Sequence, residues 1–261
     1  MNLERRRLLG ATAGLAFMGT GVLAGTLPDL VARAKRSVVL VGSYGLMDNP
    51  RFGFRGTGFA VAGGLHVLTN AHVLPPDTPD RIDRSIAVQV WTPESQWLMR
   101  SARLVSKDVT HDLALLQIDG PPVPALRLAA KEAPEGTAIA LIGFPIGGLL
   151  GYSHVTHRGI VSARTAIVPP AAGPQGLSER AVRQLRQGSF EVVQLDATAY
   201  PGNSGGPVLD VETGEVVGVV SMVLVKGTKE AALSAPSGIS YAVPVRDAAA
   251  MLADAELRQQ P

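Results

Sequence analysis

The sequence predicts an all-β fold of two six-stranded antiparallel barrels, followed by a short C-terminal helix. Three observations support this prediction. Glycine (29 residues) and proline (19 residues) are both abundant, and they punctuate sheets and interrupt helices. Short apolar, β-branched runs recur from Ser37 onwards in two groups. The proline-rich segment 120–124 separates the groups, and proline cannot donate to a sheet ladder.

The individual strands follow from these runs. In the first group we expect Ser37–Val41, Gly58–Val61, His66–Thr69, Ser85–Trp91, Ala102–Val105 and Leu113–Ile118. In the second group we expect Ala138–Ile142, Thr156–Ala163, Glu191–Asp196, Pro207–Asp210, Val216–Val223 and Ile239–Val243. Helical patterns are limited to Asp29–Arg36 with Asp29 as its cap, Ser178–Gln187, and Val245–Leu257 with Asp247 in its first turn.

The chain therefore divides into an N-terminal segment, two barrels and a tail. The expected boundaries are 1–25 for the N-terminal segment, 26–124 for the first barrel, 125–244 for the second and 245–261 for the helix and tail. A hydrophobic fraction of 46% with only 18% charged residues is typical of a packed globular protein rather than a disordered one.

Residues 1–25 are expected to be a targeting segment rather than part of the fold. Arg5-Arg6-Arg7-Leu8-Leu9 fits the twin-arginine export pattern, and an uncharged stretch with several glycines follows. Val22-Leu23-Ala24 and Ala32-Arg33-Ala34 are candidate cleavage sites. The alternative is an uncleaved membrane anchor over residues 8–28, although its glycines weaken it. Both interpretations place the remainder in the periplasm or another extracytoplasmic space.

Charge and composition exclude several function classes. Residues 1–25 carry three arginines and one glutamate, so the net charge of +2 leaves 21 basic and 21 acidic residues (24 − 3 and 22 − 1) elsewhere. No basic stripe with interleaved aromatic residues remains, so nucleic acid is not an expected partner. The chain has no cysteine, which excludes disulfides, thiolate nucleophiles and cysteine–zinc sites. No pattern calls for a metal or an organic cofactor.

The strongest chemical signal is Gly202-Asn203-Ser204-Gly205-Gly206-Pro207. A serine hydroxyl becomes a useful nucleophile only when a base takes its proton. Glycines around it let the backbone turn so that two N–H groups point at one spot, where a developing oxyanion could be held. We expect these donors to be the N–H groups of Gly202 and Ser204. Alone, the motif is also compatible with a glycine-rich turn that contains an incidental serine.

Two further motifs supply a base and a carboxylate. His72 follows an apolar strand and has small Ala71 beside it, which suits an accessible general base, whereas the other histidines are interpreted as structural. Asp112 directly precedes a buried strand and would hold His72 in the tautomer that accepts from Ser204. Asp108 is a rival for this role, but its polar loop beside Lys107 favours Asp112.

The order of the three residues carries more weight than any one motif. His72 precedes Asp112 by 40 residues and Asp112 precedes Ser204 by 92 (112 − 72 and 204 − 112). The order His, Asp, Ser is that of the chymotrypsin arrangement and differs from those of subtilisin and the α/β-hydrolases. It places the first two residues in the first strand group and Ser204 in the second. The sequence therefore predicts a serine protease whose active site lies between two barrels.

Further segments resemble the HtrA/Deg-type branch of trypsin-like serine proteases, from about Asp29 to Val245. They are Gly56-Thr57-Gly58-Phe59, Ile142-Gly143-Phe144-Pro145-Ile146-Gly147, Arg158-Gly159-Ile160-Val161-Ser162-Ala163, Gln194-Leu195-Asp196-Ala197 and Gly238-Ile239-Ser240-Tyr241-Ala242-Val243-Pro244. The resemblance implies a serine endopeptidase that acts on exported, unfolded or damaged polypeptides through an acyl-enzyme.

The resemblance also implies a substrate site. Its primary pocket would be lined by Thr198, Ala199 and Tyr200 and by Ser221, Met222 and Val223. Thr198 stands where an aspartate would select arginine or lysine, so small or medium apolar side chains are expected there. The backbone of Ser221–Val223 would pair with an extended substrate as an added strand.

Two departures from the family pattern limit which family properties can be expected of this chain. Only about 17 residues follow Pro244, so no PDZ domain is expected after the protease domain. The region Thr165–Gly188 matches nothing assignable and is either a regulatory loop or an insertion. A trimer is the oligomer that the resemblance suggests, but the N-terminal segments that build such trimers are not identified here.

Three functions compete at this point. The first is an active endopeptidase. The second is a chaperone-like or gated binding module of the same fold with weak proteolysis, and the third is a non-peptide acyl hydrolase. Because all three triad residue types are present, a dead pseudoenzyme has the least support.

Overall fold

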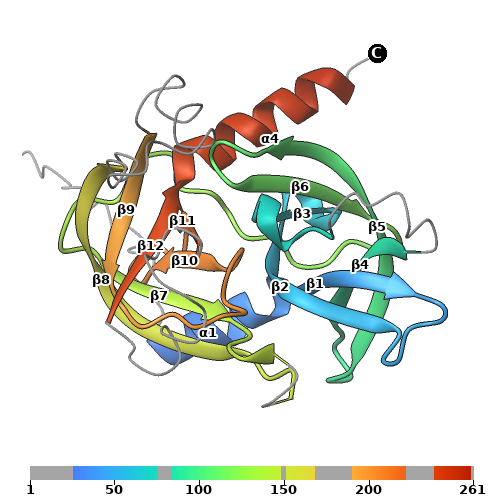
Figure 1. Cartoon of the computed structure of the whole chain (residues 1–261). Helices are drawn as coiled ribbons and strands as arrows, with labels where there is room; N and C mark the ends of the chain where they lie inside the picture. Colours follow the sequence, from blue (N-terminus) through green and yellow to red (C-terminus); the bar gives the residue numbers. More distant parts are fainter. Residues whose placement is uncertain (1–25, 76–83, 148–150, 168–189, 222–237, 260–261) are drawn as a thin grey trace, which may run out of the picture.

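Two closed antiparallel barrels lie side by side in the computed structural model, which describes residues 26–75, 84–147, 151–167, 190–221 and 238–259 (Figure 1). The strand order is β1-β2-β3-β6-β5-β4 in the first barrel and β10-β11-β12-β9-β8-β7 in the second. Each barrel has six strands, and helix α4 follows the last of them. The predicted fold class is confirmed.

The elements have the following bounds. The first part of the chain forms α1 (Leu27–Ala34), η1 (Lys35–Ser37), β1 (Val38–Gly45), β2 (Phe52–Val61), η2 (Ala62–Gly64), β3 (His66–Thr69), η3 (Ala71–Val73), β4 (Arg84–Trp91), β5 (Trp97–Asp108) and β6 (Leu113–Ile118). The second part forms β7 (Ala138–Gly143), β8 (Val155–Ile167), β9 (Phe190–Asp196), β10 (Pro207–Asp210), β11 (Val216–Val220), β12 (Ile239–Pro244) and α4 (Val245–Gln259). The expected helix Ser178–Gln187 and the segment 1–25 lie outside the described residues.

Helix α1 begins earlier than predicted because its cap is Thr26 rather than Asp29. Asp29 is the third helical residue, and its Oδ2 accepts hydrogen bonds from the Thr26 N–H at 3.1 Å and the Thr26 hydroxyl at 2.7 Å. These bonds lower the pKa of Asp29. The aspartate was recognised as a helix-start residue, but the expectation that it is the cap itself was wrong.

Strand β2, which contains glycines at 53, 56 and 58, begins six residues earlier than predicted. Two of these glycines are needed for close packing within the sheet. A Cβ at Gly58 would lie 2.7 Å from a methyl of Val41 and 2.8 Å from one of Val67. A Cβ at Gly56 would lie 2.7 Å from a methyl of Val73. The glycines therefore let β2 approach the turn that follows β3.

Three apolar clusters hold the barrels and join them. One fills the first barrel, with members such as Val67 and Leu116, and another fills the second, with members such as Leu141 and Leu195. The third lies between the barrels and includes residues of both, together with Leu30 of α1 and Met251 of α4. Because both helices contribute to this shared cluster, they help fix how the two barrels pack.

Aromatic side chains extend the contact between the barrels. His154, just before β8, stacks on Trp97 of β5 with ring centroids 5.2 Å apart and lies 4.8 Å from Phe144. Its Nε2 lies 3.1 Å from the carbonyl oxygen of Val38. Burial lowers the pKa of His154, so the ring is neutral near pH 7. This histidine is structural, as expected.

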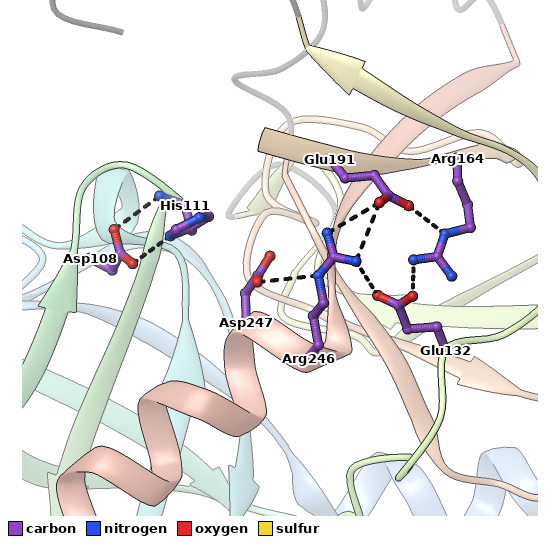
Figure 2. Close-up of polar contacts among 7 residues, drawn as sticks. All are labelled: Asp108, His111, Glu132, Arg164, Glu191, Arg246 and Asp247. Atoms are coloured by element: carbon purple, nitrogen blue, oxygen red, sulfur yellow. Dashed lines mark hydrogen bonds and ion pairs between the residues drawn. The ribbon is translucent and has the colours of Figure 1, made fainter. Parts of the chain in front are cut away.

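An ion-pair network ties α4 to the second barrel (Figure 2). Arg246 of α4 contacts Glu132 at 2.8 Å and Glu191 of β9 at 3.3 Å. Arg164 of β8 contacts the same two carboxylates. Hydrogen bonding to Arg164 lowers the pKa of Glu191. Within the described ranges, no helix combines the length and apolar character needed to cross a membrane.

We predict that the buried His154 makes the fold sensitive to acid. The unfolded chain binds a proton at this imidazole below its ordinary pKa of about 6.5, whereas the folded chain does so only at lower pH. The stability that neutral His154 contributes is therefore complete above about pH 6.5 and is lost as the pH falls towards the folded-state pKa. The slope cannot exceed about 1.4 kcal/mol per pH unit for this one proton.

Urea unfolding near pH 7.5 and near pH 5.5 tests this prediction. The wild-type chain should lose more free energy of unfolding between the two values than His154→Gln does. His157, whose pKa burial also lowers, remains in both proteins and serves as a shared background. Equal pH dependence in the two proteins would contradict the prediction.

Candidate active site

The turn that carries Ser204 comes from the second barrel and is bound to strand β2 of the first. Thr57 of β2, which is fully buried, binds the turn through both its backbone and its side chain. Its N–H donates to the Ser204 carbonyl at 2.8 Å, and its hydroxyl donates to the Gly202 carbonyl at 2.6 Å. The Phe144 N–H donates to the same hydroxyl at 3.2 Å. Thr57 thus fixes the turn between the barrels.

Two glycines allow the turn to approach this closely. Gly202 has φ +105°, and an added Cβ would lie 2.2 Å from the carbonyl oxygen of Phe144. Gly205 has φ +85°, and a Cβ there would lie 2.4 Å from the hydroxyl oxygen of Thr69. Only glycine fits both the backbone conformation and the space. Gly205 also packs near the backbone of Asn70, so the turn reaches the segment that leads to His72.

His72 and Asp112 meet as predicted from their motifs. His72 lies in η3, directly after β3, and Asp112 lies in the turn between β5 and β6. The His72 Nδ1 atom is 2.8 Å from Asp112 Oδ2, and the His72 N–H donates to Oδ1 at 3.0 Å. The carboxylate therefore holds the imidazole through Nδ1 and directs Nε2 away from itself.

Asp112 adopts a backbone conformation that is unusual for a residue with a side chain. Its φ is +55°, in the left-handed region, so its neighbours must hold it there. Its carbonyl accepts from the Ala71 N–H at 3.2 Å and from the Asn70 side-chain amide at 2.9 Å. The same segment that presents His72 therefore also fixes the backbone of Asp112.

Ser221 contacts the carboxylate from the second barrel. Its hydroxyl donates to Asp112 Oδ2 at 2.8 Å, and its side chain is fully buried. Ser221 was expected in the substrate pocket, and this bond to Asp112 was not predicted. A serine 109 residues away in the chain leaves no local pattern that indicates such a contact. The role of Thr57 was missed for the same reason.

Asp108, the rival carboxylate, has a different partner. Its Oδ2 lies 2.6 Å from His111 Nδ1, and its Oδ1 accepts from the His111 N–H at 3.0 Å (Figure 2). The same Oδ1 also accepts from the Thr110 N–H at 2.8 Å. Burial opposes ionisation of Asp108, but the hydrogen bonds from His111 outweigh it and keep the pKa below its usual value. Asp108 therefore caps the turn that ends at Asp112.

The expected pocket residues fall into two groups. Thr198, Ala199 and Tyr200 lie between β9 and the Ser204 turn; Ala199 is buried and the other two are half-buried. The Tyr200 ring lies 5.8 Å from that of His157, and its carbonyl accepts from the Asn203 N–H at 2.9 Å. Met222 and Val223 lie outside the described residues. The pocket lining stays a prediction.

Across the described part of the chain, no group of three or more His, Cys, Asp or Glu side chains could hold a metal ion. What the arrangement offers is a hydroxyl-bearing turn, an imidazole held through one nitrogen, and a carboxylate with several donors. This combination suits proton transfer to and from a serine nucleophile.

Comparison with known proteins points in the same direction. A family model described as "Trypsin-like peptidase domain" matches residues 56–219. A "Probable periplasmic serine endoprotease DegP-like" of Pseudomonas putida strain F1 is 30% identical over 191 residues, which cover 73% of this chain and 32% of the relative. A protein of the same description from Pseudomonas fluorescens strain Pf-5 is 28% identical, with the same coverage. The chain thus spans about a third of the length of these relatives.

Solved structures share the fold. The "serine endoprotease from Yersinia pestis" is 24% identical with a TM-score of 0.60, and the match covers 88% of this chain and 66% of that one. The structure named Deg5 is 23% identical with a TM-score of 0.60, covering 85% and 90% of the two chains. At this level of identity the likeness concerns the fold.

We predict that Asp108→Ala disturbs His72, whereas a matched change elsewhere does not. Asp210 caps the turn between β10 and β11 in a similar way, since its Oδ1 accepts from the N–H groups of Glu212 and Thr213. Either replacement should lower the free energy of unfolding by about 1 kcal/mol. Only Asp108→Ala should shift the NMR signals of the His72 ring, because only this turn leads to Asp112. Unchanged His72 signals in Asp108→Ala would refute the assigned role.

Proposed function

Because the chain belongs to the trypsin-like peptidase domain family, we propose that it is a serine endopeptidase with Ser204 as nucleophile, His72 as general base and Asp112 as the residue that orients His72. The observation that carries the proposal is the convergence of the two barrels on one carboxylate. Asp112 accepts from His72 of the first barrel and from Ser221 of the second, while Thr57 binds the Ser204 turn.

The contacts of Asp112 suit its proposed role. A carboxylate on Nδ1 keeps the proton on that nitrogen, so that Nε2 can accept from a serine hydroxyl. The same charge stabilises the imidazolium that forms when Nε2 takes the proton. The hydrogen bonds from the His72 N–H and the Ser221 hydroxyl hold the carboxylate in place for both tasks.

The backbone around Ser204 supports the proposed oxyanion site. The Pro201 carbonyl accepts from the Ile146 N–H at 2.7 Å, and the Asn203 carbonyl accepts from the Gly206 N–H at 2.9 Å. In a trans peptide the N–H points opposite to the carbonyl. The N–H groups of Gly202 and Ser204 are therefore directed away from these two partners by bonds already formed. We propose that they donate to the oxyanion.

The proposed reaction has two halves. Ser204 Oγ attacks the peptide carbonyl carbon while its proton passes to His72 Nε2. The C–N bond breaks as His72 returns that proton to the leaving amine, which leaves an acyl-enzyme. Water then attacks the acyl carbon with His72 again acting as base, and the serine is regenerated with release of the carboxylic acid.

The substrates and location are proposed by likeness to the relatives. Those relatives are named periplasmic serine endoproteases, and the twin-arginine pattern of residues 5–9 independently suggests export. We propose that the chain acts outside the cytoplasm on unfolded or damaged polypeptides. With Thr198 in place of an acidic residue, the preferred side chain before the cut is small or medium and apolar. A cleavage profile dominated by arginine or lysine would overturn that preference.

We predict that the full chain cleaves unfolded casein in a manner that depends on Ser204. Ser204→Ala should abolish cleavage, and His72→Ala should reduce it at least about a thousandfold, because the hydroxyl then has no base. Gel electrophoresis with mass spectrometry of the fragments measures both. Stoichiometric binding of casein without cleavage, unchanged in Ser204→Ala, would instead favour the chaperone-like alternative.

We also predict graded effects around Asp112. Asp112→Asn should lower kcat by about 10⁴, because the amide no longer enforces the reactive tautomer. Ser221→Ala removes one of several donors to Asp112 and should lower kcat by about tenfold, the equivalent of one hydrogen bond. Steady-state kinetics on a peptide taken from the casein fragments tests the order. Equal losses in the two variants would contradict the roles proposed here.

A further inference from the structure

Arg55 of β2 lies beside the proposed active site, in a position that the catalytic scheme does not use. Its Nε donates to the Val73 carbonyl at 2.7 Å, directly after His72 in the chain. The next residue, Gly56, packs so closely that an added Cβ would lie 3.0 Å from the Ser204 carbonyl oxygen. Arg55 is therefore one residue from a contact with the Ser204 turn and is tied to the His72 turn.

The guanidinium of Arg55 carries a charge that nothing on the described surface neutralises. Arg84, Arg164 and Arg246 each contact a carboxylate, but no described acidic side chain lies within ion-pair distance of Arg55. Partial burial lowers the pKa of Arg55, yet the group stays a cation at neutral pH. One N–H is used by Val73, which leaves the terminal nitrogens as a planar fork suited to a carboxylate.

The proposed mechanism indicates which part of a substrate lies near this fork. His72 hands its proton to the leaving amine, so the part of the substrate after the cut must lie on the His72 side of Ser204. The part before the cut is expected to pair with Ser221–Val223, which follow β11 of the second barrel in the chain. Arg55 belongs to the first barrel and is bound to the His72 turn, the side on which the part of the substrate after the cut is expected.

We propose that Arg55 binds the carboxylate of an aspartate or glutamate located one or two residues after the cleaved bond. This inference rests on the proposed endopeptidase function and adds a substrate preference to it. The bond to Val73 holds the guanidinium in position before substrate arrives, which limits the side-chain entropy lost on binding. A lysine or arginine at the same substrate position is disfavoured, because like charges repel at this site.

Arg51 provides a matched control. It is also exposed, it precedes Arg55 by four residues in the same β1–β2 hairpin, and it carries the same charge. If general electrostatic attraction caused the substrate preference, Arg51→Glu and Arg55→Glu would change it equally. If Arg55 itself binds the substrate carboxylate, only Arg55→Glu changes the preference.

The experiment uses one peptide that the wild-type chain cleaves, taken from its casein fragments. Three versions carry Glu, Gln or Lys at the first two positions after the cut, and kcat/KM is measured for each. At low salt, the wild type and Arg51→Glu should both prefer Glu over Lys by about tenfold. Arg55→Gln should show no preference, and Arg55→Glu should prefer Lys. Raising the salt concentration should shrink every preference, since exposed charges are screened.

The outcomes separate the two proposals. Equal preferences in the wild type, Arg55→Gln and Arg55→Glu would overturn the inference while leaving the endopeptidase intact. Should Arg55→Glu fail to fold, Arg55→Gln decides the question by itself. A wild-type chain that cuts no casein, or cuts that persist in Ser204→Ala, would overturn the proposed function and this inference with it.

Discussion

The hydrogen bonds of Thr57 are the interaction on which the rest of the site depends. Ser204 belongs to the second barrel, whereas His72 and Asp112 belong to the first, so the site exists only where the two halves meet. Thr57 joins them by binding the carbonyls of Gly202 and Ser204 with its hydroxyl and its N–H. Since it is fully buried, both groups need partners, and the turn provides them.

The unusual backbone conformations of both barrels at this site lie close to the Thr57 contact. Asp112 is in the left-handed region, and Asn70 and Ala71 hold its carbonyl. Glycines at 202 and 205 let the turn sit against Phe144, Thr57 and Thr69 at distances that no Cβ permits. Such strain and close approach are found at positions where several elements together fix one geometry. The shared apolar cluster, with both helices, supplies the rigid frame behind it.

The local sequence pattern predicted those features that depend on neighbouring residues in the chain. The strands His66–Thr69, Leu113–Ile118 and Pro207–Asp210 were predicted with the bounds that the structure has, because each is an apolar run flanked by turn residues. The pairing of His72 with Asp112 followed from two motifs at strand ends. Apart from the local Thr26–Asp29 contact that begins α1, what failed was decided by distant contacts. The start of β2 was missed, and its glycines serve its packing on Val41, Val67 and Val73. Ser221 and Thr57 acquire their roles only through tertiary contacts.

The most direct test of this account is the reaction of Ser204 with a fluorophosphonate, followed by mass spectrometry, in the wild type and in Thr57→Val. Valine keeps the volume of threonine but cannot donate to the Gly202 carbonyl, which would lose its partner. The account predicts a single adduct on Ser204 in the wild type and a labelling rate about tenfold lower in the folded variant. Adduct on another residue, or equal rates in the two proteins, would contradict it.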